Sequence, residues 1–127
     1  MIIISEEKII NSIYLTKQND FSPIISYQVK ADGIHLNVHV QVIHISFGKR
    51  YPISLAVTDH QTGKEVISAN NWFEINSPSN TGRGYGDVVT PLDLDKKDIQ
   101  GLSEISISAK ILEDKQSVIL LLKEQNQ

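Results

Sequence analysis

The stretch IISYQVKADGIHLNVHVQV, residues 24–42, alternates apolar and polar side chains on both sides of an Asp32-Gly33 dipeptide. Asp-Gly is a strong signal for a two-residue hairpin turn, because that turn needs positive φ angles that glycine adopts readily. Folding the chain about this dipeptide puts the apolar residues on one face and the polar residues on the other. The apolar pairs are Ala31 with Ile34, Val29 with Leu36, Tyr27 with Val38 and Ile25 with Val40. The stretch therefore predicts a β-hairpin within an all-β fold.

The period of two continues beyond this stretch with one interruption. At Val42-Ile43 the alternation shifts by one residue, and Ile43, Ile45 and Phe47 become the apolar set. A phase shift of one residue inside a long strand indicates a β-bulge.

Two more hairpins are expected from the same pattern. The first joins residues 53–58 to residues 65–69 through the turn DHQTGK, and the second joins residues 105–111 to residues 117–123 through a turn at Asp114-Lys115. This second turn would place Ile107 opposite Leu122.

Two segments lie outside these hairpins. Residues 90–101 predict a short strand and one helical turn, with Asp95 as its N-cap and Gly101 at its end. Near the N-terminus a strand is favoured over residues 13–16, and residues 5–11 fit a helix or a strand.

Short strands with turns at regular spacing predict a single β-sandwich domain over residues 1–127. We expect about 7–8 antiparallel strands. The architecture resembles immunoglobulin-like or C2-like sandwiches. The resemblance is one of architecture alone, because the Cys…Trp…Cys signature of immunoglobulin domains is absent from a chain without cysteine.

The composition narrows the classes of function. A formal net charge of -3 disfavours binding to nucleic acid, which depends on neutralising phosphates with lysine and arginine. The absence of cysteine excludes disulfides, thiol nucleophiles and cysteine-containing zinc sites. MIIISEEK has too short an apolar run for a signal peptide, and no apolar stretch approaches the roughly 20 residues that span a bilayer. We expect a cytoplasmic protein, and the abundance of Ile, Asn and Lys favours a bacterial or phage-infected cell as its source.

His35 and His39 have the spacing of two zinc ligands on a helix. On a strand, however, four residues span roughly 13 Å, which is too far for two ligands of one ion. A solvated polar face is predicted instead, with a pH-sensitive contact surface as the alternative.

The segment LDLDKKDIQGLSE places Asp93, Asp95 and Glu104 at positions 1, 3 and 12 of an EF-hand pattern, with Lys97 and Asp98 where a ligand and a glycine are needed. A C2-type calcium site would pair these carboxylates with those of other loops, Asp59 or Asp87. We expect no bound metal and no cofactor, and keep calcium-dependent membrane binding as an alternative function.

The segment from Asn70 to Asp87 holds the only tryptophan and several glycines. No helix or loop-ending lysine follows the glycines, so a phosphate site is not indicated. Trp72, Tyr85, Asn71 and Arg83 together offer aromatic and polar groups for a carbohydrate or small ligand. Trp72 is predicted to lie in the core or at its rim. Arg83 and Tyr85 are predicted to lie on a flexible loop, residues 76–87.

No nucleophile elbow or buried carboxylate supports catalysis, so we predict that the chain is not an enzyme. In the last hairpin Ile119 and Leu121 point away from the core, and either the MIII segment or a second subunit would have to cover them. A strand this apolar would also invite pairing if it lay at a sheet edge. The favoured function is a non-catalytic protein-interaction module that self-associates as a homodimer and binds a protein partner. Carbohydrate or small-ligand binding is the alternative.

Overall fold

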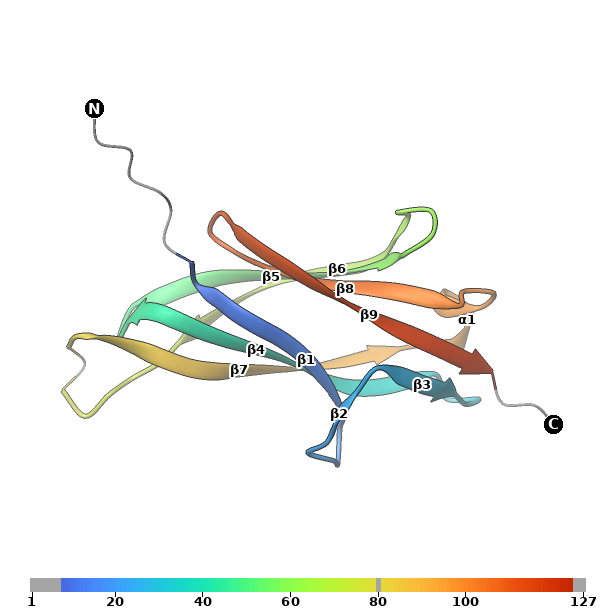
Figure 1. The fold of residues 1–127 in the computed structure, drawn as a ribbon, viewed down its shortest axis with the longest axis horizontal. Helices are drawn as coiled ribbons and strands as arrows, with labels where there is room; N and C mark the ends of the chain where they lie inside the picture. The colour runs from blue at the N-terminus through green and yellow to red at the C-terminus, as the bar shows by residue number, and fades with distance from the viewer. Residues whose placement is uncertain (1–7, 80, 125–127) are drawn as a thin grey trace.

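The computed structural model describes residues 8–79 and 81–124, which form two packed β-sheets (Figure 1). A four-stranded sheet has the order β2-β1-β4-β7, and a five-stranded sheet has the order β3-β9-β8-β5-β6. The elements are β1 (Ile10–Lys17), β2 (Pro23–Ile24), β3 (Ser26–Val29), β4 (Ile34–Ser46), β5 (Arg50–Asp59), β6 (Glu65–Glu74), β7 (Arg83–Leu94), α1 (Lys96–Ile99), β8 (Glu104–Ile111) and β9 (Asp114–Glu124). The sandwich is the predicted fold class, with nine strands in these residues.

The core is built from the alternating apolar positions of the central strands. In β4, every second residue from Ile34 to Val42 is buried, and β5 and β8 contribute Ile53, Val57 and Ile107 from the opposite sheet. β-branched side chains dominate these positions, in keeping with their preference for the pleated surface of a sheet. The alternation along β4, β5 and β8 therefore predicted the buried face correctly.

The predicted hairpin of residues 24–42 is wrong. β3 pairs in parallel with β9, whereas β4 lies between β1 and β7 in the other sheet. A turn is present, since the Gly33 amide donates to the Lys30 carbonyl at 3.0 Å, but the ladder ends after the Lys30–Gly33 bridge. The chain crosses between the sheets here, so the apolar faces of β3 and β4 meet across the core instead of side by side.

The reason for glycine at position 33 differs from the one that the hairpin supplied. Gly33 has a φ of +88°, and a Cβ atom there would lie 2.0 Å from the Leu94 carbonyl oxygen. Glycine therefore admits the end of β7 as well as turning the chain. β4 also gains long ladders with β1 and β7, whereas β3 offers four residues. The parallel β3–β9 pairing likewise departs from the predicted all-antiparallel arrangement.

The other local predictions are confirmed, one with a changed register. The β4 ladder is interrupted between Val42 and Ile45, which is the expected bulge, and β5 and β6 form the second hairpin. β8 and β9 form the third, but the turn is at Leu112-Glu113, so Ile107 lies opposite Val118 and not Leu122. The shift is an even number of residues, so the faces are unchanged.

The structure also tests the predictions for the two segments outside the hairpins, residues 90–101 and the N-terminal region. α1 follows Asp95, whose side chain makes no capping hydrogen bond, and Gly101 has a φ of +82°. Strand β1 includes the predicted residues 13–16 and begins at Ile10. Residues 5–7 and the MIII segment lie outside the described residues.

Candidate functional site

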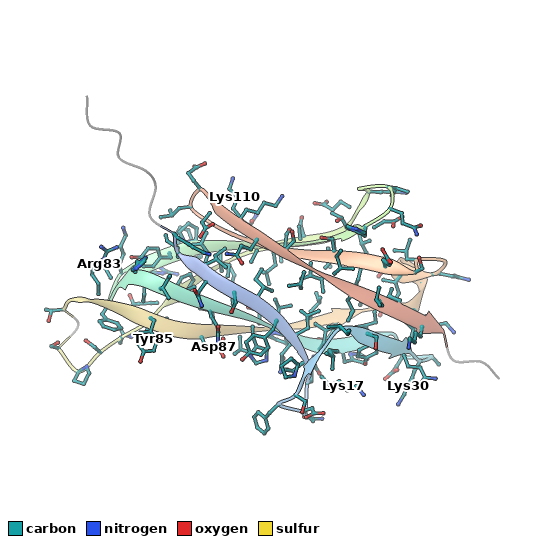
Figure 2. All side chains as sticks on the ribbon, viewed as in Figure 1. Lys17, Lys30, Arg83, Tyr85, Asp87 and Lys110 are labelled. Carbon is teal, nitrogen blue, oxygen red and sulfur yellow. The ribbon has the colours of Figure 1, made fainter. Side chains whose placement is uncertain are left out.

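One end of the sandwich contains an open cavity with a volume of about 460 Å³. The bulge of β4, the β4–β5 turn and the β8–β9 turn meet there. Arg83 lies at this end of the molecule and Lys30 at the other (Figure 2). The lining residues are Ile9, His44, Ser46, Lys49, Tyr51, Arg83, Ile111, Leu112, Glu113 and Asp114.

Backbone strain is concentrated at this end cavity. His44 and Leu112, with φ angles of 56° and 54°, are the non-glycine residues with positive φ in the described part of the chain, and both line it. Each such conformation costs roughly 1–2 kcal/mol. The bulge explains the strain at His44, and the tight hairpin turn explains it at Leu112. Strained residues cluster at binding sites, so their coincidence here marks the cavity as a candidate.

The side chains of the end cavity combine cations, acids and an aromatic ring. Arg83 Nη2 donates to the His44 carbonyl at 2.6 Å, and the Lys49 ammonium lies 5.0 Å from the centre of the Tyr51 ring. Asp114 Oδ2 accepts hydrogen bonds from the amides of Ile9 and Ile10 at 2.9 and 2.7 Å. The cavity can therefore accept a ligand or a partner side chain that carries positive or negative charge.

Arg83 and Tyr85 were predicted to lie on a flexible loop, and this prediction is wrong. Both residues lie within β7. The connection from β6 is shorter, residues 75–82. Gly84 and Gly86 lie on the inward-facing side of β7. A Cβ atom on Gly84 would lie 2.2 Å from the Phe47 ring, and a Cβ atom on Gly86 would lie 2.4 Å from the Ile75 side chain. These glycines make room for packed side chains. Tyr85 lies on the outer face of the four-stranded sheet and is 79% exposed.

Trp72 was predicted to lie in the core or at its rim, and this prediction is wrong. Its side chain is 57% exposed on the outer face of β6. The Arg50 guanidinium lies 5.3 Å from the centre of its ring. The neighbouring Phe73 takes the inward position and stacks on Tyr51, with ring centres 5.4 Å apart. Asn71 is exposed on the other side of β6 from Trp72. Trp72 and Asn71 therefore do not converge with Arg83 and Tyr85 on one site.

Ile119 and Leu121 face outward from β9, as predicted, and are 44% and 38% exposed. Ile25, which is 75% exposed, adjoins them, because its carbonyl accepts the Leu121 amide at 2.9 Å. We call Ile25, Ile119 and Leu121 the β9 patch. β9 is not an edge strand at this point, since β3 pairs with its residues 121–124. Sequence reasoning missed Ile25 because it assigned this residue to the core face of a hairpin.

His35 and His39 lie on the outer, polar face of the four-stranded sheet, as predicted. His35 Nδ1 lies 2.7 Å from Asp93 Oδ1, and its Nε2 lies 3.0 Å from the Asp32 carbonyl oxygen. The hydrogen bond with Asp93 raises the pKa of His35, and the same bond lowers the pKa of Asp93.

His39 sits in a different network. Its ring stacks on Tyr14 with centres 4.4 Å apart, its Nε2 lies 2.9 Å from Thr16 Oγ1, and its Nδ1 lies 3.4 Å from Asp87 Oδ2. The order hydroxyl, imidazole, carboxylate is that of a catalytic triad. Thr16 is only 1% exposed, however, so an external substrate does not reach the hydroxyl in this conformation. The network links side chains of β1, β4 and β7, which the backbone ladders already pair.

The carboxylates proposed for calcium do not gather. Asp93 binds His35, and Asp87 lies beside His39 and Tyr14. Within residues 8–79 and 81–124, no group of three or more His, Asp or Glu side chains is placed to hold a metal ion. The described residues give the calcium alternative no ligand set.

No family model matches the chain, and no curated protein matches it. Among solved structures it is similar to a bacterial adhesin from Mobiluncus mulieris that contains intramolecular disulfide, isopeptide and ester bond cross-links, with a TM-score of 0.61 and 11% sequence identity. The likeness is one of fold. The match covers 88% of this chain and 56% of the adhesin chain, so this chain corresponds to about half of that protein. In the part of the chain that the structure describes, no helix has the length and apolar character needed to cross a membrane.

Proposed function

We propose that the chain is a non-catalytic interaction module that binds protein and associates with a second copy of itself through the β9 patch. The exposure of Ile25, Ile119 and Leu121 on one corner of the five-stranded sheet carries the proposal. Contiguous apolar side chains on a surface mark interaction sites. The adhesin that shares the fold supports a binding role over a catalytic one. The cytoplasmic location favoured by the composition stays a prediction.

The surface around the β9 patch suits face-to-face packing of two sheets. Ser106 lies opposite Ile119 in the ladder, and Ser108 lies opposite Ser117. Glu104 lies opposite Leu121, so the apolar side chains are flanked by small and polar residues on this face. A two-fold axis through such a surface places the same residues of both copies in contact.

Sedimentation velocity across a range of protein concentrations tests this proposal. We expect a dimer whose fraction rises with concentration, and a monomer when Ile119→Lys and Leu121→Lys are combined, because lysines would be buried against one another. Val89→Lys is the matched control, since Val89 is an exposed apolar residue on the other sheet, and it leaves the dimer intact.

A chain that starts at residue 8 separates the two ways of covering the β9 patch. If the full chain is a monomer and the shortened chain dimerises, residues 1–7 cover the patch and the self-association proposal is lost. A monomer in both cases also contradicts it.

A second candidate function is the binding of a small polar ligand in the end cavity, favoured by the strain at His44 and Leu112. Amide chemical shifts during titration with a panel of monosaccharides and free amino acids test it. We expect shifts at Tyr51 and Leu112 that Arg83→Ala abolishes and Tyr85→Ala, outside this cavity, preserves. If no compound of the panel moves these signals, the small-ligand candidate is contradicted.

A further inference from the structure

The side of the sandwich formed by β6 and β7 is open. These are the last strands of the two sheets, and each has one neighbour, β5 and β4 respectively. Along its other edge, a terminal strand presents backbone N–H and C=O groups that no ladder uses. Within the described residues nothing pairs with that edge of β6.

β6 has fewer of the features that protect edge strands than β7, although its ladder with β5 contains one register shift near its start, between Val57 and Thr58. β7 carries Pro91, which has no N–H to donate, and exposes Asp87 and Asp93. Proline and charged side chains are common protection against strand addition. β6 is ten residues long, and its stretch from Val66 to Phe73 has no proline and no charge. β6 is therefore the edge suited to strand addition.

A small apolar cavity of about 70 Å³ opens beside this edge, between the two sheets. Ile67 and Ala69 of β6 line one side, and Pro91 and Leu92 of β7 line the other. Ile67 is one of the exposed large apolar residues of the structure. The cavity lies beside residues 67–69, close to the middle of β6, so a strand added to β6 would direct a central side chain into it. Its size and lining suit one aliphatic group.

The charges at the ends of β6 select the occupant. Glu65 and Glu74 are its first and last residues, and neither makes an ion pair within the described residues. A second copy of β6 in full antiparallel register would place Glu65 opposite Glu74 at both ends, and like charges in that position are destabilising. A partner with a basic residue near each end complements both glutamates.

We propose that β6 binds an extended segment of a partner protein, which adds to the five-stranded sheet, places an aliphatic side chain in the apolar cavity and presents a lysine or arginine to each glutamate. The backbone bonds supply affinity and the cavity and glutamates supply specificity, as in other cases of strand addition. This surface is separate from the β9 patch, so either proposal can fail without the other.

The probe is a synthetic peptide of about ten residues, the length of β6, with lysine at both ends, alternating threonine and valine, and a central leucine. We expect it to broaden or shift the amide signals of β6 in NMR titration. The same peptide with glutamate at both ends should bind about tenfold more weakly at low salt, because two attractive pairs of modest energy become repulsive. Aspartate in place of the central leucine should abolish binding.

A charge exchange makes the test specific to β6. Glu65→Lys combined with Glu74→Lys should reverse the preference, so that the glutamate-ended peptide binds more tightly than the lysine-ended one. Glu104→Lys combined with Glu113→Lys changes the net charge equally at other sites and should leave the preference unchanged.

Three results would overturn the proposal. They are binding of neither peptide, binding without a reversal in the Glu65→Lys, Glu74→Lys variant, and a reversal in the control variant as well. A dimer that persists in the Ile119→Lys, Leu121→Lys variant and tightens with Glu74→Lys alone would assign this edge to a second copy of the chain and contradict a basic partner.

Discussion

At the scale of single residues, His35 shows how an exposed side chain gains a preferred protonation state. Both ring nitrogens face acceptors, the Asp93 carboxylate on one side and the Asp32 carbonyl on the other. A neutral imidazole has only one N–H, so the doubly protonated ring satisfies both acceptors. The hydrogen bond with Asp93 is the main cause of the raised pKa of His35.

The pair should therefore contribute stability within an acidic window. The raised pKa of His35 gives stability that is present below its unfolded pKa and lost as pH rises through the folded value. The lowered pKa of Asp93 gives stability that is present above its unfolded pKa and lost as pH falls through the folded value. Asp93→Asn should lower the pKa of His35 toward the ordinary value of about 6.5, measured by NMR titration of the ring protons.

Asp87→Asn is the control for this titration, because Asp87 lies beside His39 and not His35. An unchanged His35 titration in Asp93→Asn would show that the exposed pair exerts no electrostatic effect in solution.

The directions of Trp72 and Phe73 could not be predicted from the local sequence. For Trp72-Phe73 the alternation of a strand predicts that one ring points inward, but local sequence does not say which. The choice follows from the cross-strand partners, because Phe73 pairs with buried Tyr51 and Trp72 pairs with half-buried Pro52. These partners become known only once the register is known.

At the scale of elements, the β8–β9 hairpin has a turn residue that its geometry disfavours. Leu112 and Glu113 form the loop, and of these two only Leu112 has a positive φ. A positive φ at the first central position is typical of a type II′ turn, where glycine is preferred. Leu112 is an exposed residue, so its side chain contributes little packing.

Leu112→Gly should therefore raise the free energy of unfolding. Relief of the left-handed conformation gains roughly 1–2 kcal/mol, and the added freedom of glycine in the unfolded chain removes about 0.5–1 kcal/mol of that. Urea denaturation measures the difference. Glu113→Gly is the neighbouring control and should lower stability, because no positive φ is relieved there. Equal losses in both variants would contradict the strain at Leu112.

The elements also explain why one hairpin was predicted wrongly and two correctly. DHQTGK joins two strands of similar length with matching alternation, so local pairing is also the most extensive pairing available. At Asp32-Gly33 the turn joins a four-residue strand to one of thirteen residues, and the longer strand pairs more extensively with β1 and β7. The residues of a turn predict where the chain changes direction. Which strands then pair in a ladder depends on the length of the pairing that distant strands offer.

At the scale of the whole molecule, side-chain alternation was sufficient for the fold class but not for the sheet order. Every strand of a sandwich presents the same pattern, so the pattern does not distinguish neighbours within a sheet from partners across the core. For the candidate sites, the outward direction of Ile119 and Leu121 was predictable from alternation alone. The end cavity was not, because it is formed by the bulge at His44 and the turn at Leu112, which are distant in the sequence.

The two sheets are connected at both ends of the molecule. At one end the chain crosses from β3 in the five-stranded sheet to β4 in the other. At the opposite end the Asp114 carboxylate of β9 accepts the amides of Ile9 and Ile10, and Gln116 donates to the Ile10 carbonyl. The amides of Ile9 and Ile10, at the start of β1, therefore donate to the Asp114 carboxylate and not to a neighbouring strand.

Asp114→Ala should destabilise the whole domain by about 2 kcal/mol, because both amides lose a charged acceptor. The loss should appear in urea denaturation, and hydrogen exchange should accelerate most at the amides of Ile9 and Ile10. Glu113→Ala removes the adjacent carboxylate and should leave both measurements nearly unchanged. If exchange at these two amides is the same in Asp114→Ala as in the native chain, then the strand ladders alone hold the sheets together at this end, and Asp114 does not connect them.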